Sequence, residues 1–345
     1  MRTSKLTPLV AAILALPALL PAQPTAQWHV VKTLPVGGPG GMDYLTVDPT
    51  THRLYVPRST HTQVIDSASG KVIGDIPGQT RSHGVALAPS VNRGFISDGG
   101  GKGGIVVFDL KTNAILGTLA AQPDADGIIY DAFTGLVLCV SGDGGVLMTF
   151  KPDIDPKSGK IDEPIILGGA PEFLASDGGG KVFINLEDKN EVAVVDLKAR
   201  KVLAHWPVAP GGSPVGLAID TKAHKLFIGC RKPQKMIVMS TDSGKILGDQ
   251  PIGAGVDATV FHGGQGLASC GDGALTVIAE TSPGKYETVQ TLKTHSGAKT
   301  MGLDPSTHTL YMPAVDFEAP KPGSNSRPAA KPGSFQIVVV TRDAK

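Results

Sequence analysis

The sequence is short of features that mark several common functional classes. It has three cysteines, Cys139, Cys230 and Cys270, with no Cys-x-x-Cys pair or Cys/His cluster, which argues against a structural metal site. Its 32 basic and 31 acidic residues leave a formal net charge of +1, so no nucleic-acid partner is expected. It also lacks a Gly-x-Ser-x-Gly nucleophile elbow and a His-Glu-x-x-His motif. Because each cysteine follows strand-like apolar residues, we predict three small buried side chains.

Only one long apolar run occurs, and it lies at the N-terminus. Arg2 and Lys5 precede the apolar segment Leu9–Leu20, and the small residues Ala22 and Ala26 follow it. This order is typical of a secretory signal peptide, and the run is shorter than the about 20 residues of a membrane-spanning helix. We predict cleavage after Ala22 or Ala26, which changes the net charge from +1 to −1. The mature chain is then expected to be soluble, without a membrane span, and periplasmic or secreted.

Glycine and proline are abundant. The chain has 44 glycines and 27 prolines in 345 residues, above the usual frequencies of about 7% and 5%. Both residues break helix interiors and favour turns. With 41% hydrophobic residues the chain is too apolar for intrinsic disorder. These values predict many short strands joined by turns.

A repeat of about 43 residues follows Trp28. One unit contains the strand-like segments 45–48, 54–56, 63–66 and 72–74, separated by Asp-Pro, Ser-Gly and other turn sequences. The position of Asp48 recurs at Ala88, Asp131, Asp177, Asp220, His262 and Asp304. Seven units of three or four strands predict the blades of a β-propeller.

The ends of the chain favour closure of this ring. The seventh unit supplies three strands and ends at 335–340, while residues 28–34 precede the first unit without partners. We predict that 28–34 forms the outer strand of the seventh blade. The predicted domains are a signal peptide at 1–26 and one all-β, seven-bladed β-propeller at 27–345.

Three segments of the chain resemble the repeats of a known family. The segments Leu54-Tyr55-Val56-Pro57 and Leu310-Tyr311-Met312-Pro313, together with the hairpin at 64–71, resemble the YVTN-type β-propeller repeat proteins of bacteria. The resemblance covers essentially the mature chain and implies an exported or surface-associated propeller. Related propellers include lactone-hydrolysing enzymes and electron-transfer domains. Electron transfer is disfavoured, because no haem-attachment or histidine-rich copper pattern is present.

Ionisable residues recur at one position of the repeat. Immediately before each predicted inner strand stand Asp43, His83, Asp126, Glu172, Pro214, Asp257 and Lys299. In a propeller these positions form a ring at one mouth of the central channel. Six of the seven are ionisable, although charged residues make up only 18% of the chain. The ring is either a ligand pocket or a solvated polar rim.

Several carboxylates near one axis repel one another unless something relieves them. This repulsion would be relieved by a bound cation, by raised pKa values, or by the positive charges of Lys299 and protonated His83. Asp126, Glu172 and Asp257 are therefore possible ligands for Ca²⁺, Mg²⁺, Zn²⁺ or Mn²⁺. Such a cation could activate water, with His83, Asp126 and Glu172 as candidate catalytic residues.

Loops between the second and third strands open on the same face. Their polar residues are Arg58, His61, Asp98, Asp143, Glu187, Arg231 and Asp272. Arg58 and Arg231 could clamp a carboxylate or phosphate, or could be ordinary loop charges. The corresponding loop of the seventh blade, 316–334, is rich in proline and glycine. It is either a lid over the channel or a disordered insertion.

The sequence favours a binding module. Its ligand site would contain Asp43, Arg58, His83, Asp126, Glu172, Arg231, Asp257 and Lys299, and its partner would be a small molecule or an envelope protein. The alternative is a metal-assisted hydrolase or lyase that acts on a lactone or sugar-acid-like molecule at the same mouth. Whether the chain is an enzyme stays open at this level.

Overall fold

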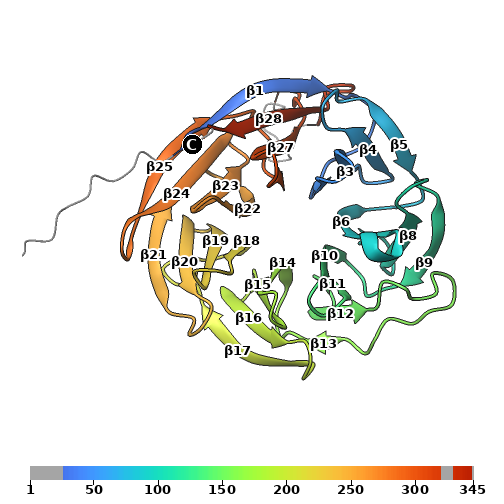
Figure 1. Ribbon diagram of the computed structural model, residues 1–345, viewed down its shortest axis with the longest axis horizontal. Coiled ribbons are helices and arrows are strands. Elements are labelled where there is room, and N and C mark those ends of the chain that lie inside the picture. The colour runs from blue at the N-terminus through green and yellow to red at the C-terminus, as the bar shows by residue number, and fades with distance from the viewer. Residues whose placement is uncertain (1–25, 320–328, 344–345) are drawn as a thin grey trace, which may run out of the picture.

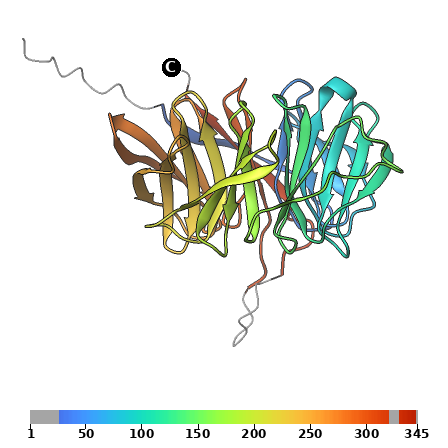
Figure 2. The same cartoon turned by 90° about the horizontal axis from the view of Figure 1, so that it is seen from below.

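The computed structural model describes residues 26–319 and 329–343. These residues form seven four-stranded antiparallel sheets. Figure 1 shows the sheets arranged as the blades of a ring, and Figure 2 shows the same ring from the side. The predicted all-β, seven-bladed propeller is confirmed. The predicted signal peptide falls outside the described residues except for Ala26.

The strands of the first three blades run outward in chain order. Blade one contains β2 (Thr46–Asp48), β3 (Arg53–Pro57), β4 (Thr62–Asp66) and β5 (Val72–Ile76). Blade two contains β6 (Ser82–Ala88), β7 (Arg93–Asp98), β8 (Gly104–Asp109) and β9 (Ile115–Ala120), with the 3-10 turn η1 (Pro89–Val91) after β6. Blade three contains β10 (Ala125–Asp131), β11 (Leu136–Ser141), β12 (Val146–Phe150) and β13 (Ile165–Ile166).

Blades four to six repeat this order, and blade seven departs from it. Blade four contains β14 (Pro171–Ser176), β15 (Lys181–Leu186), β16 (Glu191–Asp196) and β17 (Lys201–Pro207). Blade five contains β18 (Pro214–Asp220), β19 (Lys225–Arg231), β20 (Gln234–Ser240) and β21 (Ile246–Pro251). Blade six contains β22 (Val256–His262), β23 (Gln265–Cys270), β24 (Ala274–Ser282) and β25 (Lys285–Lys293). Blade seven contains β26 (Gly302–Asp304), β27 (Thr309–Ala314), β28 (Gln336–Arg342) and β1 (Trp28–Pro35).

The N-terminal strand closes the ring, as predicted. β1 pairs antiparallel with β28, from Trp28 opposite Arg342 to Pro35 opposite Gln336. The Trp28 side chain is fully buried, and its indole N–H donates to Gln265 Oε1 at 2.9 Å. β1 therefore completes blade seven and also anchors it to blade six.

Adjacent blades pack through apolar clusters. Between blades two and three the rings of Phe95 and Phe150 meet edge to face at 5.4 Å, within one buried cluster that includes Cys139. Cys139, Cys230 and Cys270 are all free and buried, which confirms the prediction of small core side chains. Full burial of one large apolar side chain stabilises a fold by about 1.5–3 kcal/mol, so these clusters hold the blades together.

Recurrent aspartates and histidines shape the turns away from the mouth. The carboxylates of Asp48 and Asp131 accept backbone N–H groups two or three residues ahead, from Thr50 and Thr134 at 2.9 Å each. Left-handed backbone with φ near +55° recurs at His52, His224 and His308. These residues repeat because the turns of the blades need them.

The long loop of blade seven begins as a short antiparallel stem. Phe317 and Ala330 form an isolated bridge, and the Lys331 N–H donates to the Asp316 carbonyl at 2.8 Å. Figure 2 shows this stem leaving one face of the disc. Residues 320–328 are outside the described part, so the lid and the insertion remain predictions. Within the described residues no helix is long and apolar enough to cross a bilayer.

Candidate functional site at the channel mouth

The mouth residues are held by a repeated irregularity of the inner strands. In β6 the pairing register shifts between Ser82 and Val85, and in β10 it shifts between Ala125 and Ile128. Equivalent shifts occur near the start of β14, β18 and β22. A β-bulge leaves residues unpaired and re-aims their side chains. His83 and Asp126 are among these unpaired residues.

The bulges correct one detail of the sequence prediction. Asp43 and Lys299 do precede their inner strands, β2 and β26. The other five ring residues lie within the first two positions of theirs, namely His83, Asp126, Glu172, Pro214 and Asp257. The strand begins earlier there because its first residue still pairs before the register shifts.

A glycine lets the bulges of neighbouring blades approach closely. Gly127 follows Asp126, and a Cβ on it would lie 2.7 Å from the carbonyl oxygen of Glu172. Contacts under 3.0 Å to backbone do not occur for real Cβ atoms. Glycine at this position therefore keeps Asp126 and Glu172 on adjoining inner strands at close range.

The first half of the mouth places one histidine between two acids. His83 Nδ1 lies 2.7 Å from Asp43 Oδ2 and 3.6 Å from Asp126 Oδ1. The His83 side chain is 9% exposed, and that of Asp126 is 15% exposed. Two buried atoms, His83 Nε2 and Asp126 Oδ1, have no hydrogen-bond partner. A buried polar atom left unpaired costs about 1–3 kcal/mol, so this half is incomplete in the protein alone.

The electrostatics of this half favour the protonated forms of His83 and Asp126. Burial by itself lowers the pKa of His83, but the hydrogen bond to Asp43 and the charges of Asp126 and Asp43 outweigh it, and the net pKa is raised. Burial raises the pKa of Asp126 to about 7; nearby His83 opposes the rise and the charge of Asp43 adds to it. Near neutral pH this half therefore holds a partly protonated carboxyl beside a histidine with a raised pKa.

Glu172 adds a second carboxyl that retains its proton. Burial, then hydrogen bonding with the neighbouring Glu187 and the charges of Asp126 and Glu187, raise its pKa to about 9, against the opposing charge of Arg231. Glu187, which the sequence placed in a loop on this face, thus belongs to the same cluster. A protonated Glu172 presents a donor as well as an acceptor.

In the second half of the mouth, one buried carboxylate forms ion pairs with two bases. The Asp257 side chain is 3% exposed; its Oδ1 lies 2.7 Å from Arg231 Nη2 and its Oδ2 lies 2.8 Å from Lys299 Nζ. Arg231 also donates through Nε to the Val256 carbonyl at 3.0 Å and lies 3.5 Å from Glu187. Both oxygens of Asp257 are occupied, so Arg231 is committed to a carboxylate of the protein itself.

Arg58 does not join the mouth cluster. Its side chain is fully buried, with the guanidinium 3.6 Å from the ring centre of Phe335. Nε, Nη1 and Nη2 donate to the carbonyls of Gly37, Gly38, Gly40 and Gly41 and to Gln63 Oε1. Arg58 fixes the glycine-rich connection between β1 and β2 and has no free donor, so we leave it out of the ligand site.

Tyr44 forms the floor of the mouth together with Phe173. Burial and then the charges of Asp126, Asp257, Asp43 and Glu172 raise the pKa of Tyr44 well above its ordinary value. Its ring lies 5.0 Å from that of Phe173, across the channel from blade one to blade four. Both aromatics follow a ring position directly, while the other blades have Gly84, Gly127, Val215, Ala258 and Thr300 there. Two bulky residues among small ones were the signal that sequence reasoning missed.

No described residues form a metal site by geometry. Within 26–319 and 329–343, no group of three or more His, Cys, Asp or Glu side chains is arranged to hold a metal ion. Asp257, one of the three predicted ligands, binds Arg231 and Lys299 instead. The metal site predicted at Asp126, Glu172 and Asp257 therefore stays a prediction without geometric support.

The fold and the channel mouth define the class of the chain, which is a seven-bladed β-propeller. No protein-family model matches the sequence, and a search of curated proteins found no match. Among solved structures, one chain of a mitotic checkpoint complex superposes with a TM-score of 0.72. The match covers 97% of this chain and 100% of that one at 13% identity, a likeness that shows the fold alone.

Proposed function

We propose that this protein is a binding module that takes a small molecule at the channel mouth. The observation that carries the proposal is the contrast within one buried cluster. Asp257 has an ion pair on each oxygen, while Asp126 Oδ1 and His83 Nε2 are buried without a hydrogen bond. Unpaired polar groups held by the scaffold are what a specific ligand completes. We further propose that the protein is a YVTN-type propeller that acts in the periplasm or outside the cell.

The chemistry of the mouth favours a ligand that carries an organic ammonium group. Asp43, Asp126 and Glu172 supply three carboxyl groups against one histidine. An ammonium group would donate to oxygens of all three, including the carbonyl oxygen of protonated Glu172, and its charge would favour the ionised form of Asp126. The aromatic floor of Tyr44 and Phe173 suits the apolar part of such a ligand and adds cation–π attraction.

Matched ring compounds test this proposal. Benzylamine, benzyl alcohol and benzoate share a ring and differ in the charge of the head group. Calorimetric titration at pH 8 should show saturable benzylamine binding, with the alcohol at least tenfold weaker and benzoate undetectable. The variant Asp126→Asn should weaken benzylamine binding about tenfold, which corresponds to about 1.4 kcal/mol.

A charge-matched substitution on the same face serves as the control for Asp126→Asn. Asp143 lies exposed on a loop of the same face, and Asp143→Asn changes the net charge by the same amount. It should leave the benzylamine affinity unchanged. Equal binding of all three ring compounds, or equal losses in Asp143→Asn and Asp126→Asn, would contradict an ammonium site at the mouth.

The rival readings from the sequence remain open to simple tests. A metal-assisted hydrolase or lyase predicts stoichiometric Ca²⁺, Mg²⁺, Zn²⁺ or Mn²⁺ in the purified protein, lost in Asp126→Ala and Glu172→Ala. An envelope-protein partner predicts a specific complex that forms through this face. The small-molecule proposal expects neither.

A further inference from the structure

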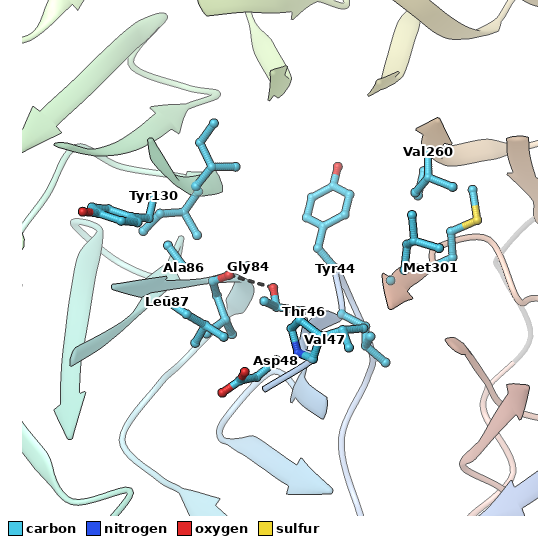
Figure 3. A pocket seen from close by; sticks show the side chains of 18 of the residues that line it. Tyr44, Thr46, Val47, Asp48, Gly84, Ala86, Leu87, Tyr130, Val260 and Met301 are labelled. Carbon is cyan, nitrogen blue, oxygen red and sulfur yellow. Dashed lines mark hydrogen bonds between the residues drawn. The ribbon is translucent and has the colours of Figure 1, made fainter. Parts of the chain in front are cut away.

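A second compartment lies behind the mouth, on the other side of Tyr44. It is a cavity of about 580 Å³, lined by inner strands of blades one, two, three, four, six and seven. Figure 3 shows Tyr44 among its lining residues, between the strands of the ring. Asp43, His83, Asp126 and Glu172 are not among its lining residues. We call this space the rear cavity.

The lining of the rear cavity is mostly apolar. Its apolar side chains include Val47, Leu87, Phe173, Val260 and Met301. In Figure 3, Leu87 lies on one side of the centre of the ring, and Val260 and Met301 lie on the other. Contributions from six blades place apolar groups on all sides of the channel. A cavity of this size falls within the range of about 300–1,000 Å³ that holds small molecules. The shape therefore fits a small molecule inside the channel and not a flat protein surface.

Two polar side chains of the rear cavity are hydrogen-bonded within the protein, whereas the buried Thr259 hydroxyl in its wall has no hydrogen-bond partner among the described residues. Thr46 Oγ1 donates to the Val85 carbonyl at 2.7 Å, across the gap between blades one and two. Asp48, a carboxylate at the rim, accepts from the backbone N–H groups of Thr50 and Thr51 and from the Thr51 hydroxyl. No described lysine, arginine or histidine lines the cavity, so a negatively charged ligand would find no counter-charge here, and its desolvation would go uncompensated.

We infer that the rear cavity is a second binding site, which takes an uncharged, ring-bearing apolar molecule. The ring of Tyr44 forms its floor, and the carboxyl cluster lies beyond that floor. The two sites thus differ in chemistry on either side of one aromatic side chain, because the mouth presents a cluster of buried carboxyls, whereas the rear cavity is mostly apolar and has its one carboxylate, Asp48, at the rim. This inference does not depend on the proposed ammonium site.

Two naphthalene dyes that differ in one charged group test the inference. N-phenyl-1-naphthylamine is neutral, and 8-anilino-1-naphthalenesulfonate carries a sulfonate on a similar ring system. Fluorescence titration of the folded protein should show one saturable site for the neutral dye, with a Kd on the order of 1–10 μM. The sulfonate should bind at least tenfold more weakly.

Cavity-filling variants locate the dye. Val260→Phe and Val47→Phe each place a larger side chain in the rear cavity and should weaken binding of the neutral dye at least tenfold. Val72 lies 44% exposed on the outer strand β5, and Val72→Phe is the matched control that should change binding less than twofold. Two filling variants are used so that one that fails to fold does not decide the outcome.

Three results would overturn the inference. These are no saturable binding of the neutral dye, unchanged binding in a folded Val260→Phe or Val47→Phe variant, and displacement of the dye by benzylamine. The last would place the dye in the mouth. Failure of the dye assay with intact benzylamine binding would remove the rear site and leave the proposed function standing.

Discussion

The two halves of the channel mouth use the same residue types with different results. In one half two acids, Asp43 and Asp126, share the single base His83. In the other half a single buried acid, Asp257, is held by the two bases Arg231 and Lys299. Burial and the neighbouring acids raise the pKa of Asp126 to about 7, whereas Asp257 has an ion pair on each oxygen.

The comparison distinguishes a buried carboxylate that stabilises the fold from one that is free to bind a ligand. A buried carboxylate that is fully paired contributes to the local structure, since removal of a partner leaves a charge uncompensated. A buried carboxyl such as Asp126, which shares one histidine with a second acid and whose Oδ1 accepts no hydrogen bond, is costly to the fold, and such groups cluster at functional sites. The position of a residue in the ring thus says less about its role than the number of bases around it.

The largest expected effect comes from one substitution made in both halves. Asp257→Asn should lower the free energy of unfolding at pH 8 by about 3 kcal/mol, because Arg231 and Lys299 lose their shared partner. Asp126→Asn should be neutral or stabilising, because it removes a buried carboxyl that has too few bases. Urea unfolding measures both variants, and equal losses would remove the distinction between the halves.

A smaller effect is expected in the pH dependence of stability. Acids with raised pKa values in the folded state make folding less favourable as pH rises above their ordinary values, and His83, with its raised pKa, loses its contribution in the same direction. From pH 5 to pH 8.5 these groups should reduce the free energy of unfolding. Asp126→Asn should flatten that decline by about 2 kcal/mol.

The pH experiment has a clear contrary outcome. If urea unfolding of Asp126→Asn shows the same change between pH 5 and pH 8.5 as the wild type, Asp126 does not keep its proton in the folded protein. The exposed variant Asp143→Asn serves as the control and should retain the wild-type decline.

The smallest effect is expected at Tyr44, in the floor of the mouth. Tyr44→Phe keeps the ring contact with Phe173 and removes a hydroxyl that lies among carboxyl groups. The free energy of unfolding should change by less than about 1 kcal/mol, because no hydrogen bond of this hydroxyl holds the fold. Tyr44→Ala should cost more, since it opens the floor between the mouth and the rear cavity. Similar losses in the two variants, measured by thermal unfolding, would show that the hydroxyl and not the ring matters.

The fold was predictable from the sequence because the blades of a propeller repeat, so their strands and turns recur at a regular spacing along the chain. The recurrence of turn residues such as Asp48 and His52 follows the blades, and each blade needs the same turns. Closure was predictable as well, because segment 28–34 had no partner in its own unit and blade seven lacked a strand. Neither inference required knowledge of side-chain direction.

The pairing within the site was not predictable from spacing. The repeat placed Asp126 and Asp257 at equivalent positions, but only the three-dimensional structure shows that Arg231 and Lys299 both reach Asp257. Arg58 was predicted as a ligand clamp, and its burial depends on the glycine-rich connection between β1 and β2, whose carbonyls accept its hydrogen bonds. β-Bulges, which set the direction of His83 and Asp126, leave no clear mark in a single sequence.

The most direct test is the titration of the Asp126 carboxyl carbon by NMR. Aspartate labelled at the carboxyl carbon gives the signals, and the signal absent from Asp126→Asn identifies the residue. The structure predicts a midpoint at about pH 7, because the carboxyl is buried beside Asp43 and His83. A signal that titrates fully below pH 5 would show an ordinary, already paired carboxylate and would contradict the unpaired half of the mouth.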